Sequence, residues 1–152
     1  LEFAAAQGLV INLHVTEPVG RPYAPRVDTN FRDIQWIVER LPELRIVLAH
    51  WGGLVFMHEL NPYLSQRWAN VYYDTAASPL LYDMRLFRIA LDVIGSDRIV
   101  FGSDFPLRLY PGEPGGPDFK RFIDRIHDHV PDPKAREHLF RENARRLFAL
   151  DS

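Results

Sequence analysis

The sequence predicts an α/β protein built on a parallel sheet. Four short apolar segments alternate with longer segments in which apolar residues recur at spacings of three and four, so the chain reads β-α-β-α-β-α-β-α. The short segments are almost continuously apolar, which is typical of strands that are covered on both faces. Strands that alternate with helices imply right-handed crossovers and therefore a parallel sheet.

The composition is that of an ordinary globular protein, and it disfavours several classes of partner. The chain has 152 residues, of which 47% are hydrophobic and 25% are charged, and its formal net charge is -2. This charge balance indicates neither a nucleic acid nor a membrane surface as a partner. The sequence contains no cysteine, which excludes disulfide and thiolate chemistry within it and favours a cytoplasmic location.

The expected elements follow from apolar periodicity and from turn-forming residues. Thr29 is predicted to cap a helix over 30–40, and Ser78 is predicted to cap a helix that Gly95 closes. The expected strands cover 9–15, 44–50, 71–75 and 99–104. The remaining expected elements are a broken helix over 54–68, helices over 118–130 and from 132 onward, and proline-rich loops over 18–28 and 105–117.

Three residues of metal-binding type fall at the ends of predicted strands. They are His14, His50 and Asp104. The carboxyl ends of parallel strands meet in space and host the sites of α/β proteins, so these distant residues can converge. Imidazole nitrogen and carboxylate oxygen are ligands for Zn²⁺ and similar ions. A bound cation would offset the expected cost of burying Asp104. For each residue alone, a purely structural role is the alternative.

Other residues near these strand ends are weaker candidates. Trp51 could form the wall of a substrate pocket or pack against the strand exit, and Glu17 could point into the site or remain a solvated loop carboxylate. Asp74 could hydrogen-bond to the backbone or to a neighbouring ligand. The loop arginines, which could hold an acidic substrate but are better interpreted as solvated surface charges, are Arg21, Arg26 and Arg108.

Four ordered motifs resemble those of the amidohydrolase superfamily. They are LHVTEP at 13–18, AHWGG at 49–53, VYYDT at 71–75 and FGSDFP at 101–106, and the closing segment ENARRLF at 142–148 is similar to the family's terminal helix. The resemblance is to the amidohydrolase-related branch of TIM-barrel metal-dependent hydrolases, which includes aminocarboxymuconate-semialdehyde decarboxylase and its relatives. It implies an α/β TIM (β/α)8 barrel, of which this chain supplies about four βα units, strands five to eight.

The resemblance also implies a role for each residue. His14 would be a metal ligand at the end of strand five, and His50 would be the catalytic histidine at the end of strand six. Asp104, at the end of strand eight, would bind the divalent metal, preferably zinc, and accept a proton from the attacking water. The implied activity is hydrolysis of a C–N or C–O bond in a small-molecule substrate. Non-oxidative decarboxylation of an unsaturated or aromatic carboxylic acid is one alternative, and a non-catalytic half-barrel that serves as an interaction module is another.

The sequence departs from the family in one respect. The His-x-His pair that the family carries on its first strand has no counterpart before His14. We therefore expect residues 1–152 to be the C-terminal half of a barrel, forming a single domain that is a fragment of a longer protein. Four parallel strands alone leave two open edges. We expect the chain to self-associate or to pair with a missing N-terminal half, and to have little activity by itself.

Overall fold

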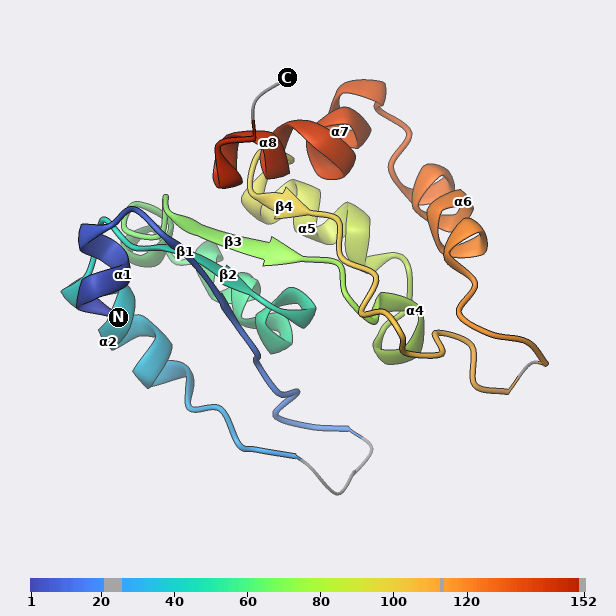
Figure 1. Ribbon diagram of the computed structural model, residues 1–152, viewed down its shortest axis with the longest axis horizontal. Helices are drawn as coiled ribbons and strands as arrows, with labels where there is room; N and C mark the ends of the chain where they lie inside the picture. Colours follow the sequence, from blue (N-terminus) through green and yellow to red (C-terminus); the bar gives the residue numbers. More distant parts are fainter. Residues whose placement is uncertain (21–25, 113, 151–152) are drawn as a thin grey trace. The chain divides into compact units, whose positions relative to one another are not determined.

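The computed structural model describes residues 1–20, 26–112 and 114–150. The chain divides into two compact units, Leu1–Asp74 and Thr75–Ser152, while the expectation of a single domain stays a prediction. The alternation of strands and helices confirms the predicted α/β class (Figure 1). The elements of the first unit are α1 (Glu2–Ala6), β1 (Val10–Leu13), α2 (Phe31–Arg40), β2 (Arg45–Leu48), η1 (His50–Leu60), α3 (Pro62–Ser65) and β3 (Val71–Asp74).

The sheet of the first unit is parallel, as the sequence predicts. β1 pairs with β2 and β2 pairs with β3, in a register that places Leu13 opposite Leu48 and Leu48 opposite Tyr73. β3 is buried along its whole length, and β2 is buried except at its first residue. Because this register aligns the carboxyl ends of the three strands, the residues that follow them emerge at one edge of the sheet. His14 and His50 are among these residues.

Helix α2 begins with a different cap from the predicted one. The side chain of Asn30, and not that of Thr29, accepts a hydrogen bond from the backbone N–H of Arg32 at 3.1 Å. Asn is at least as effective as Thr at an N-cap. The Thr29 hydroxyl oxygen instead accepts a hydrogen bond from the backbone N–H of Thr16, also at 3.1 Å. This bond ties the segment before α2 to the segment that leaves β1.

The second unit contains α4 (Ser78–Leu81), α5 (Leu86–Ile94), β4 (Ile99–Val100), α6 (Phe119–His129), α7 (Pro133–Glu137), η2 (His138–Glu142) and α8 (Asn143–Phe148). The single helix predicted from Ser78 to Gly95 is therefore two helices, of which Gly95 closes the second. Ser78 is the first residue of α4 and not its cap, because its hydroxyl donates to the carbonyl of Thr75 at 2.6 Å.

The last helical region of the second unit holds the short strand β4, against which η2 and α8 pack (Figure 1). The backbone N–H of Phe101 donates to the carbonyl of Leu139 at 2.9 Å. The amide of the fully buried Asn143 donates to the carbonyls of Ser96 and Ile99, each at 2.7 Å. These bonds fix both ends of a strand that has only two residues.

Each unit has its own apolar core. In the first unit, Ile34 of α2 and Phe56 of η1 are buried, and the ring of Phe56 meets that of Tyr73 edge to face at 6.0 Å. In the second unit, the rings of Phe87 from α5 and Phe122 from α6 lie 6.4 Å apart. Among the described residues, no helix combines the length and the apolar character that crossing a membrane requires.

Candidate active site

The structure brings together two of the predicted site residues, His14 and His50. His14 directly follows β1, and His50 begins the segment that follows β2. The Nε2 atom of His50 lies 3.2 Å from the Nδ1 atom of His14. The two rings meet edge to face, with their centroids 5.1 Å apart and an angle of 74° between their planes. Two adjacent parallel strands therefore deliver both imidazoles to one point.

The ring of His14 is oriented by its own loop. Its Nε2 atom lies 3.1 Å from the hydroxyl oxygen of Thr16, and Thr16 is itself buried and bonded to Thr29. In the tautomer that donates from Nε2 to Thr16, the Nδ1 lone pair of His14 is directed toward His50. His14 is exposed and His50 is half-buried, so a ligand can approach the pair.

The spacing of the two facing nitrogens suits a shared cation. Two nitrogens bound to one tetrahedral zinc at about 2.0–2.1 Å lie about 3.3 Å from each other, and those of His14 and His50 are 3.2 Å apart. In the part of the chain that the structure describes, no group of three or more His, Cys, Asp or Glu side chains is arranged to hold a metal ion. The spacing of the two rings is therefore compatible with two neighbouring positions around an ion, and it is equally that of a hydrogen bond between the rings.

His50 begins a left-handed turn that the sequence analysis missed. All of residues 50–54 have φ between 58° and 69°. This conformation costs non-glycine residues about 1–2 kcal/mol each, and His50, Trp51 and Leu54 adopt it. Gly52 and Gly53 adopt it without that cost, and the Gly-Gly pair was the available signal in the sequence. The turn redirects the chain immediately after β2.

We expect the substitution Gly53→Ala to destabilise the protein by about 1–3 kcal/mol. Gly53 has φ +58°, and an added Cβ would lie 3.0 Å from the carbonyl oxygen of Thr16 and 3.3 Å from a Val15 methyl group. Urea unfolding followed by circular dichroism measures the effect. Gly116→Ala is the matched control, because a Cβ there meets no heavy atom within 4 Å. Equal stabilities of the two variants would contradict the prediction.

Trp51 lies in the core of the first unit. Its exposed fraction is 0%, and its ring centroid lies 6.0 Å from that of Phe56. Of the two interpretations of Trp51, the structure displays the packing contact, and its contact with substrate stays a prediction.

Glu17 is half-buried, and one of its carboxyl oxygens, Oε1, lacks a hydrogen-bond partner among the described residues. Its Oε1 atom is inaccessible to solvent. Burial raises the pKa of Glu17 from 4.5 to about 7, because desolvation disfavours the charged carboxylate. The carboxyl is therefore present in both protonation states near neutral pH, and its predicted role in substrate binding stays open to test.

The raised pKa of Glu17 predicts a pH-dependent stability. The folded state binds the proton of Glu17 more tightly than the unfolded state does. The contribution of Glu17 to the free energy of unfolding therefore falls as the pH rises from about 4.5 to about 7, and above that range it stays at its lower value. We expect Glu17→Gln to be about 1 kcal/mol more stable than the wild type at pH 8, a value reduced for solvent screening. At pH 4.5 the two proteins should be nearly equal.

Thermal unfolding at pH 4.5 and pH 8 measures this difference in stability. Glu43→Gln, which neutralises an exposed carboxylate, is the control and should show no such pH dependence. A constant difference between Glu17→Gln and the wild type at both pH values would refute the prediction.

Asp104 belongs to the second unit, and its surroundings differ from the predicted ones. The sequence predicts Asp104 at the end of a buried strand, but β4 ends at Val100 and Asp104 is exposed with φ 60°. The expected cost of burying its carboxylate is therefore wrong for this structure. Beyond Val100 the backbone bonds outside a strand ladder, since the N–H of Phe101 donates to the carbonyl of Leu139 and the N–H of Gly102 to the Thr75 hydroxyl. The carbonyl of Asp104 accepts a hydrogen bond from the N–H of Leu107 at 2.8 Å.

The two residues at the end of β3 hydrogen-bond to backbone groups, which for Asp74 is the first of the two roles that the sequence left open. The carboxylate Oδ1 of Asp74 accepts a hydrogen bond from the backbone N–H of His50 at 2.7 Å. The Thr75 hydroxyl accepts from the N–H of Gly102 and donates to its carbonyl, each at 3.0 Å. The signal in the sequence was a hydrogen-bonding pair, Asp-Thr, directly after an apolar strand.

Two of the three loop arginines, Arg26 and Arg108, are among the described residues. Arg26 donates to the carbonyl of Pro18 at 2.8 Å and pairs with Asp28 at 3.3 Å. Arg108 is exposed. Arg21 and part of the predicted 18–28 loop lie outside the described residues.

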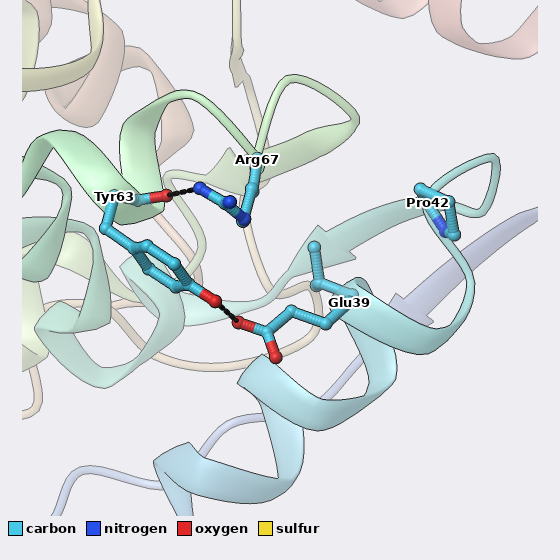
Figure 2. Close-up of a pocket in the computed structure, with 5 residues that line it drawn as sticks. Glu39, Pro42, Tyr63 and Arg67 are labelled. Carbon is cyan, nitrogen blue, oxygen red and sulfur yellow. Dashed lines mark hydrogen bonds between the residues drawn. The ribbon is translucent and has the colours of Figure 1, made fainter.

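A cavity of about 330 Å³ lies on the first unit, away from the histidine pair. Figure 2 shows its lining, in which the Tyr63 hydroxyl donates to Glu39 at 3.1 Å and Arg67 donates to the carbonyl of Tyr63 at 3.0 Å. Val38 and Pro42 complete the lining. Because Pro42 precedes β2, this cavity is at the amino ends of the strands, whereas sites of parallel α/β proteins lie at the carboxyl ends.

The fold and the histidine pair define a parallel α/β protein with its candidate site at the carboxyl ends of the strands. A family model described as Amidohydrolase matches residues 1–150. The chain therefore belongs to the amidohydrolase family, which confirms the predicted resemblance.

Solved structures with a similar fold include a TIM-barrel protein, a decarboxylase and an amidohydrolase. A TIM-barrel protein from Bordetella bronchiseptica has a TM-score of 0.71 and 23% identity, with 97% of this chain and 48% of that chain covered. 5-Carboxyvanillate decarboxylase from Sphingomonas paucimobilis has a TM-score of 0.71 and 17% identity, with 99% of this chain and 52% of that chain covered. An amidohydrolase from Burkholderia multivorans with bound zinc has a TM-score of 0.63 and 20% identity, with 98% of this chain and 55% of that chain covered. These likenesses confirm the TIM-barrel fold class, and the chain spans about half the length of each structure.

Proposed function

We propose that this chain supplies part of the active site of a metal-dependent hydrolase, in which an activated water attacks a C–N or C–O bond of a small molecule. The observation that carries the proposal is the 3.2 Å approach of His14 Nδ1 and His50 Nε2 at adjacent strand ends. Membership of the amidohydrolase family supports it. So does the bound zinc of the similar Burkholderia amidohydrolase.

In this proposal each polar residue has one task. His14 and Asp104 would hold the ion, preferably zinc, which when bound makes a water acidic enough to act as a nucleophile near neutral pH. Thr16 contacts the ring of His14 at Nε2, and the other ring nitrogen, Nδ1, faces His50. The Nε2 atom of His50 lies 3.2 Å from Nδ1 of His14. In this proposal His50 polarises the substrate or transfers a proton beside the ion that His14 holds. The Asp104 carboxylate accepts the proton of the attacking water.

A decarboxylase is the second candidate, and the likeness to 5-carboxyvanillate decarboxylase favours it. In this reaction the C–C bond to a carboxylate breaks, CO₂ leaves and the remaining carbon takes up a proton. His50 is the group placed to deliver that proton from Nε2. The same histidine pair therefore serves either reaction, and the products distinguish them.

Two measurements test these candidates, on the purified protein expressed at the full length that its gene encodes. Elemental analysis should find a bound divalent metal. Turnover is then assayed with a panel of amides, esters and lactones and with 5-carboxyvanillate. Hydrolysis without CO₂ supports the hydrolase, and CO₂ released in proportion to substrate consumed supports the decarboxylase. A protein without metal and without turnover would overturn both candidates and leave a non-catalytic interaction module.

A further inference from the structure

Asp74, the last residue of β3, holds the backbone of His50. Its carboxylate accepts the His50 N–H at 2.7 Å, and only 7% of the residue is exposed. A hydrogen bond from a backbone N–H to a carboxylate is shorter and stronger than one to a neutral carbonyl. It acts on the first residue of the left-handed turn, where the backbone conformation is unfavourable and needs an external restraint. Asp74 therefore restrains the backbone of His50, two residues after β2 ends.

Thr75 holds the backbone that leads to Asp104. Its exposed fraction is 0%, and its hydroxyl pairs with both the N–H and the carbonyl of Gly102. The backbone N–H of Thr75 donates to the carbonyl of Val100 at 3.1 Å. The side chain thus continues the pairing beyond the last residue of β4. A hydroxyl suits this position because it donates and accepts at once, whereas a valine of similar shape would leave both groups of Gly102 without these bonds.

We propose that Asp74 and Thr75 are positioning residues of the active site, Asp74 acting on the backbone of His50 and Thr75 on the backbone that carries Asp104. The inference rests on the proposed function of His50 and Asp104. Residues that support metal ligands change metal affinity or activity by about 10–100-fold when they are replaced. The two positions should differ in effect, because Thr75 supports a proposed ligand and Asp74 supports the proposed catalytic histidine.

The test at position 75 is a calorimetric titration of the protein with Zn²⁺ alone. We expect Thr75→Val to weaken zinc binding by about 10-fold or more, and Thr75→Ser, which keeps the hydroxyl, to remain within about 3-fold of the wild type. Ser78→Ala is the control, because it removes a buried hydroxyl that donates to the carbonyl of Thr75 on the same segment. Its zinc affinity should match that of the wild type.

The test at position 74 separates kcat from zinc affinity and KM. Asp74→Ala should lower kcat by about 10–100-fold while zinc affinity and KM change little. Asp74→Asn retains an acceptor oxygen for the His50 N–H and should recover most of kcat. A residue that merely stabilised the fold would lower the melting temperature without this split between kcat and zinc affinity.

Two results would overturn the inference while the proposed function stood. One is zinc affinity and kcat equal to wild type in Thr75→Val and Asp74→Ala. The other is an equal loss of zinc affinity in Thr75→Val and Ser78→Ala, which would reflect stability alone. A wild-type protein without zinc binding or turnover is a distinct result, because it removes the proposed function and the inference that rests on it.

Discussion

Replacing Asp104 with Asn is expected to lower kcat by about 10²–10⁴-fold, the range typical for loss of a group that transfers a proton in the transition state. The amide of Asn keeps the shape and one acceptor oxygen of the carboxylate, but it cannot accept a proton and is a weaker metal ligand. Asp104 is exposed, so the substitution should change the free energy of unfolding by less than about 0.5 kcal/mol. A loss of kcat without a loss of stability would identify a chemical role.

The measurement is steady-state kinetics with a substrate identified by the panel, together with elemental analysis and thermal unfolding of the same preparation. Asp92→Asn is the matched control, since Asp92 is an exposed aspartate of α5 in the same unit. The control should retain wild-type kcat. If Asp104→Asn retains wild-type kcat and metal content as well, Asp104 is neither a ligand nor a proton acceptor.

The second large effect concerns the histidine pair. We expect the substitution of His14 to change metal content and the substitution of His50 to change kcat. His14→Gln should remove most of the bound metal, because it deletes a proposed ligand and the ring that Thr16 orients. His50→Gln should keep most of the metal and lower kcat by about 10²–10⁴-fold, because it deletes the group proposed to transfer a proton. The 3.2 Å contact between the two rings makes this separation informative, since neighbouring residues often fail together.

Metal content and kcat of the two single variants and of the double variant test this separation. We expect the double variant to be no less active than His14→Gln alone, because residues that act as one unit have non-additive effects. His127→Gln, which replaces an exposed histidine on α6, is the control for histidine loss and should leave metal content unchanged. Equal metal loss in His14→Gln and His50→Gln would instead make His50 a ligand, in agreement with the spacing of the two nitrogens.

The regular elements could be predicted from the sequence because their signals are local and repeated. Apolar residues at spacings of three and four located α2, α5 and α6, and the apolar runs located the strands. The residues at which the helices begin were harder to predict from the sequence. Thr29 and Ser78 are good N-cap residues by type, but their hydroxyls bond to Thr16 and Thr75 instead. A hydroxyl takes the partner that the tertiary structure places beside it, and propensity alone does not identify that partner.

In the candidate site, too, some features could be predicted from the sequence and others could not. Residue type and position after a strand were sufficient to select His14 and His50, because a parallel sheet gathers its carboxyl ends. The same reasoning placed Asp104 in a buried environment, and there it was wrong. β4 ends at Val100, and the next backbone groups bond to Leu139 and Thr75, which are far from them in the sequence.

The sequence by itself determined the α/β class, the order of the elements, the family, and the approach of two histidines. Each of these depends on residue type and on spacing along the chain. Only the tertiary structure decided the left-handed turn at His50 and the contacts of Asp74 and Thr75. It also decided the burial of Glu17, whose Oε1 atom lacks a hydrogen-bond partner among the described residues. These features depend on which backbone groups lie opposite one another after folding, and side chains far apart in the sequence then satisfy those groups or leave them unpaired.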